Sequence, residues 1–468
     1  MALIKSISGI RGTIGGKPGE TLSPLDVVRF TAAYGTWLQR LAGGKRRKHV
    51  VVGRDGRISG EMVQQLVVST LNALGIDVAD VGPSTTPTVE MAVISTKADG
   101  GIILTASHNP QDWNALKLLN NKGEFVSAAD GAAILDIAGK DDYHFAPVER
   151  LGVTLRKENA LQEHIDAILQ HPLVDVPAIK KRKFHIVLDA INSTGALAVP
   201  ALFRALGVKT FTVLNEEING RFAHNPEPLP QHLTGLCAEV TRQEADLGIA
   251  VDPDVDRLCF VCEDGSLFGE EYTLVAIADY VLKNLPAGSR SNAATVSNLS
   301  STRALRDVTA GHKGTYHSSA VGEVNVVTRM KEVHAVIGGE GNGGIIVPEL
   351  HYGRDALIGI ALFLSFLARE KKSARQLRST YPDYFMSKNK IELANGSNLK
   401  KIFTAIRKKY SKNPVNTEDG LKIEFENDWV HLRGSNTEPI IRIYAESNFE
   451  ATANNIAKKM MKDIREVL

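Results

Sequence analysis

Residues 49–82 read HVVVGRDGRISGEMVQQLVVSTLNALGIDVADVG, and this stretch decides the fold class. The valines at 50–52 predict a short buried strand, and a second apolar run at residues 77–81 predicts another. Between them, apolar residues recur at the spacing of one helix face: Val63, Leu66, Val67, Leu71 and Leu74. The stretch is therefore predicted to form a βαβ unit.

The same order of elements repeats along the chain, at residues 184–215 and, more loosely, at residues 293–322. This repetition predicts three related α/β domains. From about residue 371 the pattern changes, with helical periods at residues 398–410 and 451–467 around strand-like LKIEFEN, WVHLRG and IIRIYAE. We expect an α+β domain there, and domains spanning residues 1–150, 151–255, 256–370 and 371–468.

Composition narrows the class of protein. The 468 residues are 43% hydrophobic and 23% charged, with a formal net charge of +2 and only short basic runs, which argues against nucleic acid as a partner. No stretch reaches the roughly 20 apolar residues that cross a bilayer. The three cysteines and the lack of an apolar leader fit a soluble protein of the reducing cytoplasm.

Residues 101–110, GIILTASHNP, run from an apolar strand into a polar cluster that contains Ser107 and His108. Strand ends are where α/β proteins place reactive groups. A Ser/His hydrolase pair is disfavoured, because adjacent residues on extended backbone point to opposite sides and no G-x-S-x-G elbow is present. A capped turn without chemistry is the alternative.

The stretch DPDVDR carries Asp252, Asp254 and Asp256, whose alternation predicts three carboxylates on one face of an extended segment. Such crowding requires a cation, and oxygen ligands favour Mg²⁺ or Ca²⁺. An EF-hand is excluded because Arg257 stands where that loop needs glycine. Arg257 also suggests a neighbouring phosphoryl group, whereas a purely structural metal is the alternative.

The glycine-rich stretch GGEGNGG at residues 338–344 offers Glu340 and Asn342 to a close polar ligand. Its spacing does not match G-x-G-x-x-G, and an extended segment follows instead of a helix, so dinucleotide binding is disfavoured. The two side chains suit vicinal sugar hydroxyls, and a plain turn is the alternative.

Residues 433–439, RGSNTEP, lie between two predicted strands and gather hydroxyl, amide and guanidinium groups. A hairpin turn would use similar residues, but the set also suits a phosphate dianion. The candidate phosphate ligands are Arg433, Ser435, Asn436, Thr437 and, just beyond, Arg442.

Taken in order, TASHNP, DPDVDR, GEGNGG and RGSNTEP, with SGIRG at residues 8–12, resemble the signature of the α-D-phosphohexomutase superfamily over essentially the whole chain. The resemblance implies a heart-shaped enzyme in which three similar mixed α/β domains and a C-terminal α+β domain surround a central cleft. It also implies one motif per domain.

The resemblance assigns a role to each candidate residue. Ser107 would carry a phosphoryl group, Asp252, Asp254 and Asp256 would hold Mg²⁺ together with a phosphoserine oxygen, and Arg257 and Arg11 would offset charge. Lys117 would be the general acid/base, with its pKa lowered by nearby cations, and His108 would support it. Glu340 and Asn342 would bind ring hydroxyls, and the residues around Arg433 the phosphate that is not reacting.

Two positions depart from the pattern of the resembled family. Many relatives carry histidine where this chain has Gly344, which removes a ring-contacting side chain. Pro253 and Val255 stand where many members have glycines, so a stiffer aspartate loop is expected.

The implied reaction interconverts a hexose 6-phosphate and a hexose 1-phosphate, with glucose or hexosamine 1,6-bisphosphate as activator and intermediate. GEGNGG with WNALKLL resembles the phosphoglucosamine mutase branch, so we expect glucosamine phosphate, with dual phosphomannomutase/phosphoglucomutase specificity as the alternative. A noncatalytic sugar-phosphate-binding protein and a metal-dependent sugar phosphatase are alternatives of other classes. We expect a monomer or homodimer that binds a small sugar phosphate, neither nucleic acid nor membrane.

Overall fold

The computed structural model describes residues 3–6, 9–41, 46–286, 288–393, 398–435 and 440–467. The chain forms two compact units, each built from two separate segments. Unit 1 comprises Met1–Tyr280 and Asn342–Leu377, and unit 2 comprises Val281–Gly341 and Arg378–Leu468. Within the described ranges, no helix is both long and apolar enough to cross a membrane.

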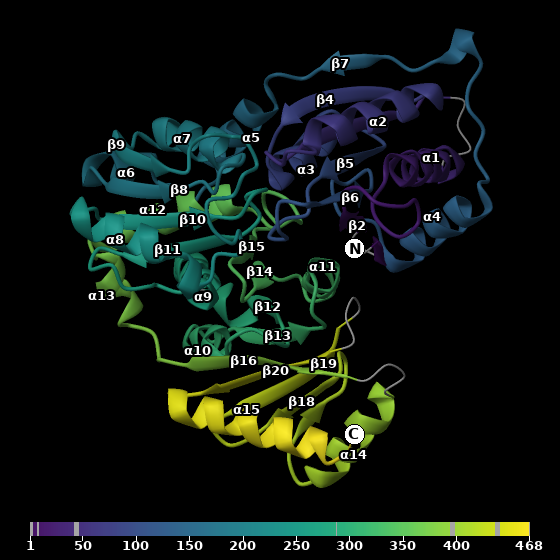
Figure 1. Ribbon diagram of the computed structural model, residues 1–468. Helices are drawn as coiled ribbons and strands as arrows, with labels where there is room; N and C mark the ends of the chain where they lie inside the picture. The colour runs from purple at the N-terminus through teal and green to yellow at the C-terminus, as the bar shows by residue number, and fades with distance from the viewer. Residues whose placement is uncertain are drawn as a thin grey trace. The chain divides into compact units, whose positions relative to one another are not determined.

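Unit 1 begins with a seven-stranded mixed sheet in the order β1-β2-β6-β5-β3-β4-β7 (Figure 1). Its strands are β1 (Leu3–Ser6), β2 (Gly9–Thr13), β3 (His49–Arg54), β4 (Asp77–Pro83), β5 (Gly100–Leu104), β6 (Trp113–Leu119) and β7 (Thr154–Arg156). Strands β3 and β4 are parallel and flank α2 (Gly60–Ala73), so the βαβ unit predicted from residues 49–82 is confirmed.

Helices cover both faces of this sheet because its central strands are apolar on both sides. One buried cluster joins the sheet to α1 (Pro24–Leu41), α2 and α4 (Ala128–Lys140). A second cluster lies against α3 (Thr86–Ser95) and the start of α5 (Ala160–Gln170). The carboxyl end of β5, where Ser107 follows, lies next to β3 in the middle of the sheet.

A second sheet of unit 1 has the order β11-β10-β8-β9. It contains β8 (His185–Asp189), β9 (Thr210–Leu214), β10 (Leu247–Val251) and β11 (Leu258–Cys262), with α6 (Val176–Arg182), α7 (Gly195–Leu206) and α8 (Thr234–Arg242) beside it. Strands β8 and β9 are parallel, which confirms the second predicted repeat. The antiparallel step from β10 to β11 places the aspartate motif in the turn between them.

Unit 1 is completed by its second segment, which contains β15 (Gly344–Ile346) and α12 (Ala356–Glu370). Helix α12 is apolar on every side and almost wholly buried, as expected for a helix surrounded by protein. It packs against α5, α6, α7 and β11. Helices α9 (Glu270–Asn284) and α13 (Ala374–Arg378) lie where the chain passes between units.

Unit 2 contains the third repeat and the C-terminal domain. The parallel strands β12 (Ala294–Asn298) and β13 (Thr315–Ser319) flank α10 (Ala304–Gly311), and β12 also pairs with β14 (Ile337–Glu340), which follows α11 (Glu323–Glu332). The looser repeat predicted at residues 293–322 is therefore confirmed.

The C-terminal domain is an antiparallel sheet in the order β16-β20-β19-β18-β17, with α14 (Leu399–Lys409) and α15 (Glu450–Arg465) packed into its buried cluster (Figure 1). Its strands are β16 (Phe385–Glu392), β17 (Val415–Asn416), β18 (Leu421–Glu424), β19 (Trp429–Gly434) and β20 (Ile440–Ser447). The predicted fold class, three mixed α/β domains and an α+β tail, is confirmed, whereas the domain limits at residues 150, 255 and 370 stay predictions.

Candidate active site

Ser107 lies in a strained turn just beyond β5. Its φ is +49°, a left-handed conformation that is uncommon for residues other than glycine and clusters at functional sites. The Ser107 amide donates to Thr105 Oγ1 at 2.9 Å, which fixes the turn. As a result the largely buried hydroxyl points away from its own strand and donates to Asp252 Oδ2 at 2.7 Å.

Arg57 holds this turn from the segment that follows the neighbouring strand, β3. Its guanidinium donates to four backbone carbonyls of the Ser107 loop, those of Ser107, Asn109, Pro110 and Trp113. Asp55 Oδ2 orients the guanidinium from the other side, at 3.0 Å from Nε. Arg57 was not predicted, although GRDGR at residues 53–57 runs out of the end of β3 and the pairing of β3 with β5 places it here.

The three aspartates meet in the turn between β10 and β11. All three side chains are fully buried, and one oxygen of each lies within 4.8 Å of the others. The expected extended segment was wrong: Val255 has a φ of +61°, so the chain turns sharply inside the motif. Asp252 Oδ1 accepts the amides of Asp256 and Arg257, each at 3.1 Å, and this folded loop gathers the carboxylates.

This arrangement fits a hard divalent cation. Asp254 Oδ1 and Asp256 Oδ1 are buried and, within the described part of the chain, have no hydrogen-bond partner. Burial and the Asp256 and Asp254 carboxylates raise the pKa of Asp252 well above its usual range, a sign of crowded negative charge. Oxygen ligands of this kind suit Mg²⁺.

Lys117, on β6, bridges two of these aspartates. Its Nζ lies 2.7 Å from Asp254 Oδ2 and 3.4 Å from Asp256 Oδ2. We predicted a lowered pKa for Lys117, and this was wrong. Burial alone would lower the pKa, but the two carboxylates outweigh burial and raise it above its usual value.

His108 lies on the same side as Ser107, with Nδ1 at 3.3 Å from Ser107 Oγ. The expectation that adjacent side chains diverge was wrong, because it assumed an extended backbone and Ser107 is left-handed. Burial and the nearby Arg257 guanidinium lower the pKa of His108 well below its usual value, and Arg11 and Arg354 add to the effect. A neutral imidazole therefore faces the serine at neutral pH.

Arg11 and Arg257 approach the serine loop from different elements. Arg11 sits in the middle of β2, opposite Ala115 of β6. Arg257 ends the aspartate turn, is largely buried, and lies 3.4 Å from Glu227 Oε1. Because both guanidinium groups affect the pKa of His108, both belong to the electrostatic surroundings of the Ser107 loop.

The glycine-rich motif is divided between the two units. Glu340 ends β14 in unit 2, where Oε1 accepts from Asn298 Nδ2 at 2.8 Å and from the Gly322 amide at 3.1 Å. Asn342 belongs to unit 1, and its Oδ1 accepts the Gly344 amide at 3.1 Å. Both side chains are thus already engaged in shaping their own loops.

The candidate phosphate ligands that the structure describes lie in unit 2. Arg433 of β19 and Arg442 of β20 are directly paired across the antiparallel ladder, so their side chains leave the same face of the sheet at neighbouring positions. Arg433 Nε lies 2.7 Å from Asp419 Oδ2, and the Ser435 amide donates to the Ile440 carbonyl at 3.0 Å. Asn436 and Thr437 fall outside the described residues.

Comparison with protein families matches four consecutive stretches of this chain. Residues 3–144, 162–265 and 269–384 match the alpha/beta/alpha domains I, II and III of phosphoglucomutase/phosphomannomutase, and residues 390–463 match its C-terminal domain. The chain belongs to the phosphoglucomutase/phosphomannomutase family.

Individual members of the family resemble the chain over almost its full length. A phosphoglucomutase/phosphomannomutase of Thermococcus kodakarensis is 36% identical over 98% of both chains. A phosphoglucosamine/phosphogalactosamine mutase of Sulfurisphaera tokodaii is 31% identical over 99% of both. A crystal structure of a phosphoglucomutase/phosphomannomutase family protein from Burkholderia thailandensis has a TM-score of 0.83 and 25% identity, covering 99% of this chain and 98% of that one.

Two further residues of this chain contact the aspartates of its DPDVDR motif and were not predicted from the sequence. Thr86 Oγ1 donates to Asp254 Oδ2 at 2.6 Å from the start of α3, and Arg354 Nη2 donates to Asp256 Oδ2 at 2.6 Å from the turn before α12. Arg354 is 98 positions from its partner, and no spacing in the sequence signals the contact.

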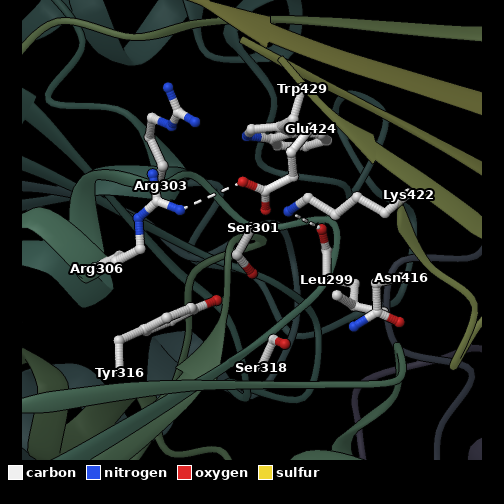
Figure 2. Close-up of a pocket in the computed structure, with 10 residues that line it drawn as sticks. All are labelled: Leu299, Ser301, Arg303, Arg306, Tyr316, Ser318, Asn416, Lys422, Glu424 and Trp429. Atoms are coloured by element: carbon white, nitrogen blue, oxygen red, sulfur yellow. Dashed lines mark hydrogen bonds and ion pairs between the residues drawn. The ribbon is translucent and has the colours of Figure 1, made fainter. Parts of the chain in front are cut away.

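A pocket in unit 2 is lined by other residues and has a volume of about 410 Å³, part of it open to solvent (Figure 2). Figure 2 shows Lys422 and Trp429 on one side of it and Arg303 and Arg306 on the other. Lys422 Nζ donates to the Leu299 carbonyl at 2.8 Å and lies 4.0 Å from the Trp429 ring centre. None of the residues predicted for catalysis or binding lines this pocket.

Proposed function

We propose that this phosphohexomutase interconverts glucosamine 6-phosphate and glucosamine 1-phosphate through phospho-Ser107 and a 1,6-bisphosphate. The hydrogen bond of 2.7 Å between Ser107 Oγ and Asp252 Oδ2 carries the proposal, because it places a hydroxyl nucleophile at the edge of a buried carboxylate cluster. A phosphorylated Ser107 would lie against the cation that those carboxylates suit.

In the first half-reaction the bond between phosphorus and Ser107 Oγ breaks as a sugar hydroxyl oxygen forms a bond to the same phosphorus. The sugar hydroxyl loses a proton and Ser107 Oγ gains one, and the second half-reaction reverses both transfers at the other end of the sugar. When bound by Asp252, Asp254 and Asp256, Mg²⁺ would draw charge from the phosphoryl group in transit. Lys117 is the proposed acid/base for the sugar hydroxyl, and Arg11 and Arg257 offset the phosphoryl charge.

The remaining predicted residues are proposed to position the sugar. Glu340 and Asn342 would bind ring hydroxyls, and Arg433, Ser435, Asn436, Thr437 and Arg442 the phosphate that is not reacting. The cross-strand pairing of Arg433 with Arg442 supports a dianion site, since it places two arginine side chains next to each other on one face of the sheet and guanidinium groups bind phosphate oxygens. The 1,6-bisphosphate must turn end for end so that either phosphate can reach Ser107.

The hexose is the least constrained part of the proposal. Several relatives are named as phosphoglucosamine mutases, whereas the Thermococcus kodakarensis protein at 36% identity is named for glucose and mannose phosphates. Dual phosphoglucomutase/phosphomannomutase specificity is therefore the second candidate. Sugar-phosphate hydrolysis and binding without catalysis are the competing classes.

Phosphorus NMR tests the proposal directly. Purified protein with Mg²⁺ and a trace of glucose 1,6-bisphosphate is incubated separately with the 6-phosphates of glucosamine, glucose and mannose. We expect 1-phosphates to form, fastest from glucosamine, with Ser107→Ala inactive. Ser69→Ala, on an exposed face of α2, is the matched control and should retain full activity.

Each other outcome selects an alternative. Faster glucose and mannose reactions would select dual specificity. Inorganic phosphate without sugar 1-phosphate would identify a phosphatase, because water would then be the acceptor. Binding without any turnover would exclude the mutase and leave a sugar-phosphate-binding protein.

A further inference from the structure

The space beside Gly344 is filled by another side chain of the same unit. A Cβ at Gly344 would lie 2.3 Å from Cδ and 3.1 Å from Cγ of Arg354. The backbone of Gly344 is outside the left-handed region, so its conformation alone would accept any residue. Arg354, more than Asn342 Oδ1 at 3.2 Å and not the backbone conformation, keeps position 344 free of a side chain.

The Arg354 guanidinium is aimed at the aspartate cluster. Its Nη2 donates to Asp256 Oδ2 at 2.6 Å, and Lys117 Nζ approaches the same oxygen at 3.4 Å. Asp256 Oδ1 is buried and has no hydrogen-bond partner among the described residues. Since one oxygen is tied to Arg354, rotation of the carboxylate is restricted and the other oxygen, Oδ1, is left without a protein donor and open to a cation.

The turn that carries Arg354 is anchored by the next residue. Asp355 caps α12, with Oδ1 accepting the Leu357 amide at 2.8 Å. Its other oxygen, Oδ2, lies 2.9 Å from His164 Nε2 and 3.2 Å from His351 Nε2. These three side chains are buried, so Asp355 is held between α5 and the segment before α12.

Gly353, the residue before Arg354, lets the turn approach α3. A Cβ at Gly353 would lie 1.9 Å from Glu90 Oε2, and the same oxygen is 3.4 Å from His351 Nδ1. The turn at residues 353–355 therefore packs against Glu90 at its start and is held by the hydrogen bonds of Asp355 at its end. A side chain anchored in this way has little freedom to leave Asp256.

We propose that Arg354 is a positioning residue of the cation site: it holds Asp256 Oδ2 so that Oδ1 would stay available to a cation, and this contact depends on the missing side chain at Gly344. This inference rests on the proposed function for the identity of the cation, and it assigns Arg354 no contact with the sugar. Loss of a residue that orients a metal ligand typically weakens metal affinity by about 10- to 100-fold.

The test measures binding of Mn²⁺, as a stand-in for Mg²⁺, to the full-length resting protein by electron paramagnetic resonance, without sugar. We expect Arg354→Met to weaken binding by about 10- to 100-fold and Arg354→Lys to recover part of the loss. Arg242→Met, at an exposed site of α8, should bind as wild type, and Asp252→Asn should abolish binding. If Arg354→Met tightens binding, Arg354 acts only as a competing charge and the proposal is wrong.

A double-mutant cycle tests the link with Gly344. Gly344→Ala should weaken Mn²⁺ binding by displacing Arg354, and should add nothing in the Arg354→Met background. Gly139→Ala is the matched control, because a Cβ there meets no atom within 4 Å. Additive losses would show that Gly344 acts independently of Arg354 and would overturn the inference.

Two further measurements separate the role of Arg354 from mutase activity and from a metal bound at Asp355. If the wild-type protein has no mutase activity but the Mn²⁺ affinities of the variants follow the expected double-mutant cycle, the proposed function is wrong and the role of Arg354 stands. Metal analysis checks the anchoring of Asp355, since His164, His351 and Asp355 are also close enough to ligate a metal. Stoichiometric zinc that is lost in His351→Gln would overturn the hydrogen-bonded anchor.

Discussion

Both terminal nitrogens of the Arg57 guanidinium donate to the turn that carries Ser107, and the side chain is fully buried. Lysine has three donors on a flexible stem and cannot reproduce this planar fork. We expect Arg57→Lys to lower kcat by about 100-fold, since small displacements of a reacting group have effects of this size. Faster hydrogen exchange at residues 105–113 should accompany the loss.

The neighbouring Arg54 offers a matched control, because its Nε donates to Gln64 Oε1 at 2.9 Å and makes no hydrogen bond to the serine turn. Arg54→Lys should retain kcat within a few fold. Equal losses in both variants would mean that Arg57 supports the fold in general and not the position of Ser107.

His351 predicts a pH dependence of stability. Burial would lower its pKa, but hydrogen bonds to Asp355 and Glu90 raise it to about 10, and His164 shares the same Asp355 oxygen. In the unfolded chain the pKa of a histidine is about 6.5. Between about pH 6.5 and pH 10 the folded protein therefore holds a proton on His351 that the unfolded chain has lost. The stabilisation from this proton is complete below about pH 6.5 and is lost as pH rises through about 10.

Urea unfolding of the full chain at pH 6 and pH 9 checks this sign. The free energy of unfolding should fall with pH in the wild type and less steeply in His351→Gln. That variant should also be about 3 kcal/mol less stable at pH 6, because it leaves buried carboxylates without their cation. Equal slopes in the two proteins would contradict the assignment.

At the scale of elements, a backbone hydrogen bond joins β11 to the glycine-rich loop. The Gly343 carbonyl accepts the Leu258 amide at 3.1 Å, φ at Gly343 is +85°, and a Cβ there would lie 2.2 Å from the Leu258 carbonyl oxygen. Gly343→Ala should destabilise the protein by about 2 kcal/mol through backbone strain and should disturb the aspartate turn that β11 follows.

Chemical unfolding and mutase assays of Gly343→Ala provide the measurement. Gly235→Ala in α8 is the control, since a Cβ there meets no atom within 4 Å. If the Gly343 variant unfolds with the wild type and reacts at the same rate, the close approach to Leu258 is not required.

The repeating elements could be predicted because each carries its own periodic signal. The strand, helix and strand of residues 49–82 formed as expected, and so did both later repeats. Strand β16 was missed, since its pairing with β20 depends on residues far along the chain. The left-handed Ser107 and Val255 were also missed, because tertiary contacts and not local preference impose such conformations.

The chemistry of the site was predictable only where reactive residues cluster in sequence. The polar clusters at residues 105–110 and 252–257 marked Ser107 and the aspartates as candidates, the family resemblance supplied their roles, and the structure brings Ser107 and Asp252 within hydrogen-bond distance. Arg57 and Arg354 reach the same centre from turns whose sequences carry no chemical signal of their own. Their roles come from which strands and helices end side by side, and only a folded structure supplies that information.

At the scale of the whole molecule, each unit has its own buried clusters and contains a buried basic group whose shifted pKa makes its stability depend on pH: His351 in unit 1 and Lys422 in unit 2. Burial lowers the pKa of Lys422 in unit 2 to about 8. The pKa of a lysine in the unfolded chain is about 10.4. Between these values the unfolded chain binds more protons, so this group makes unit 2 more stable as pH rises. His351 has the opposite effect on unit 1.

Scanning calorimetry between pH 7 and pH 9 should therefore move the two units in opposite directions, with unit 1 melting earlier and unit 2 later. Lys422→Met should raise the unit 2 transition at pH 7, by about 1 kcal/mol in stability, with a smaller gain at pH 9. His351→Gln should affect only unit 1. A single transition that both variants shift together would show that the units unfold as one body.

The second segment of unit 1 also has a consequence for synthesis on the ribosome. Nascent domains begin to fold before translation ends, yet the first 280 residues lack α12, which covers α5, α6, α7 and β11. Apolar surface on the growing polypeptide must stay uncovered until about residue 370 has left the exit tunnel. A ribosome that stalls before that point would release a truncated product that chaperones and proteases recognise, however well its early strands have formed.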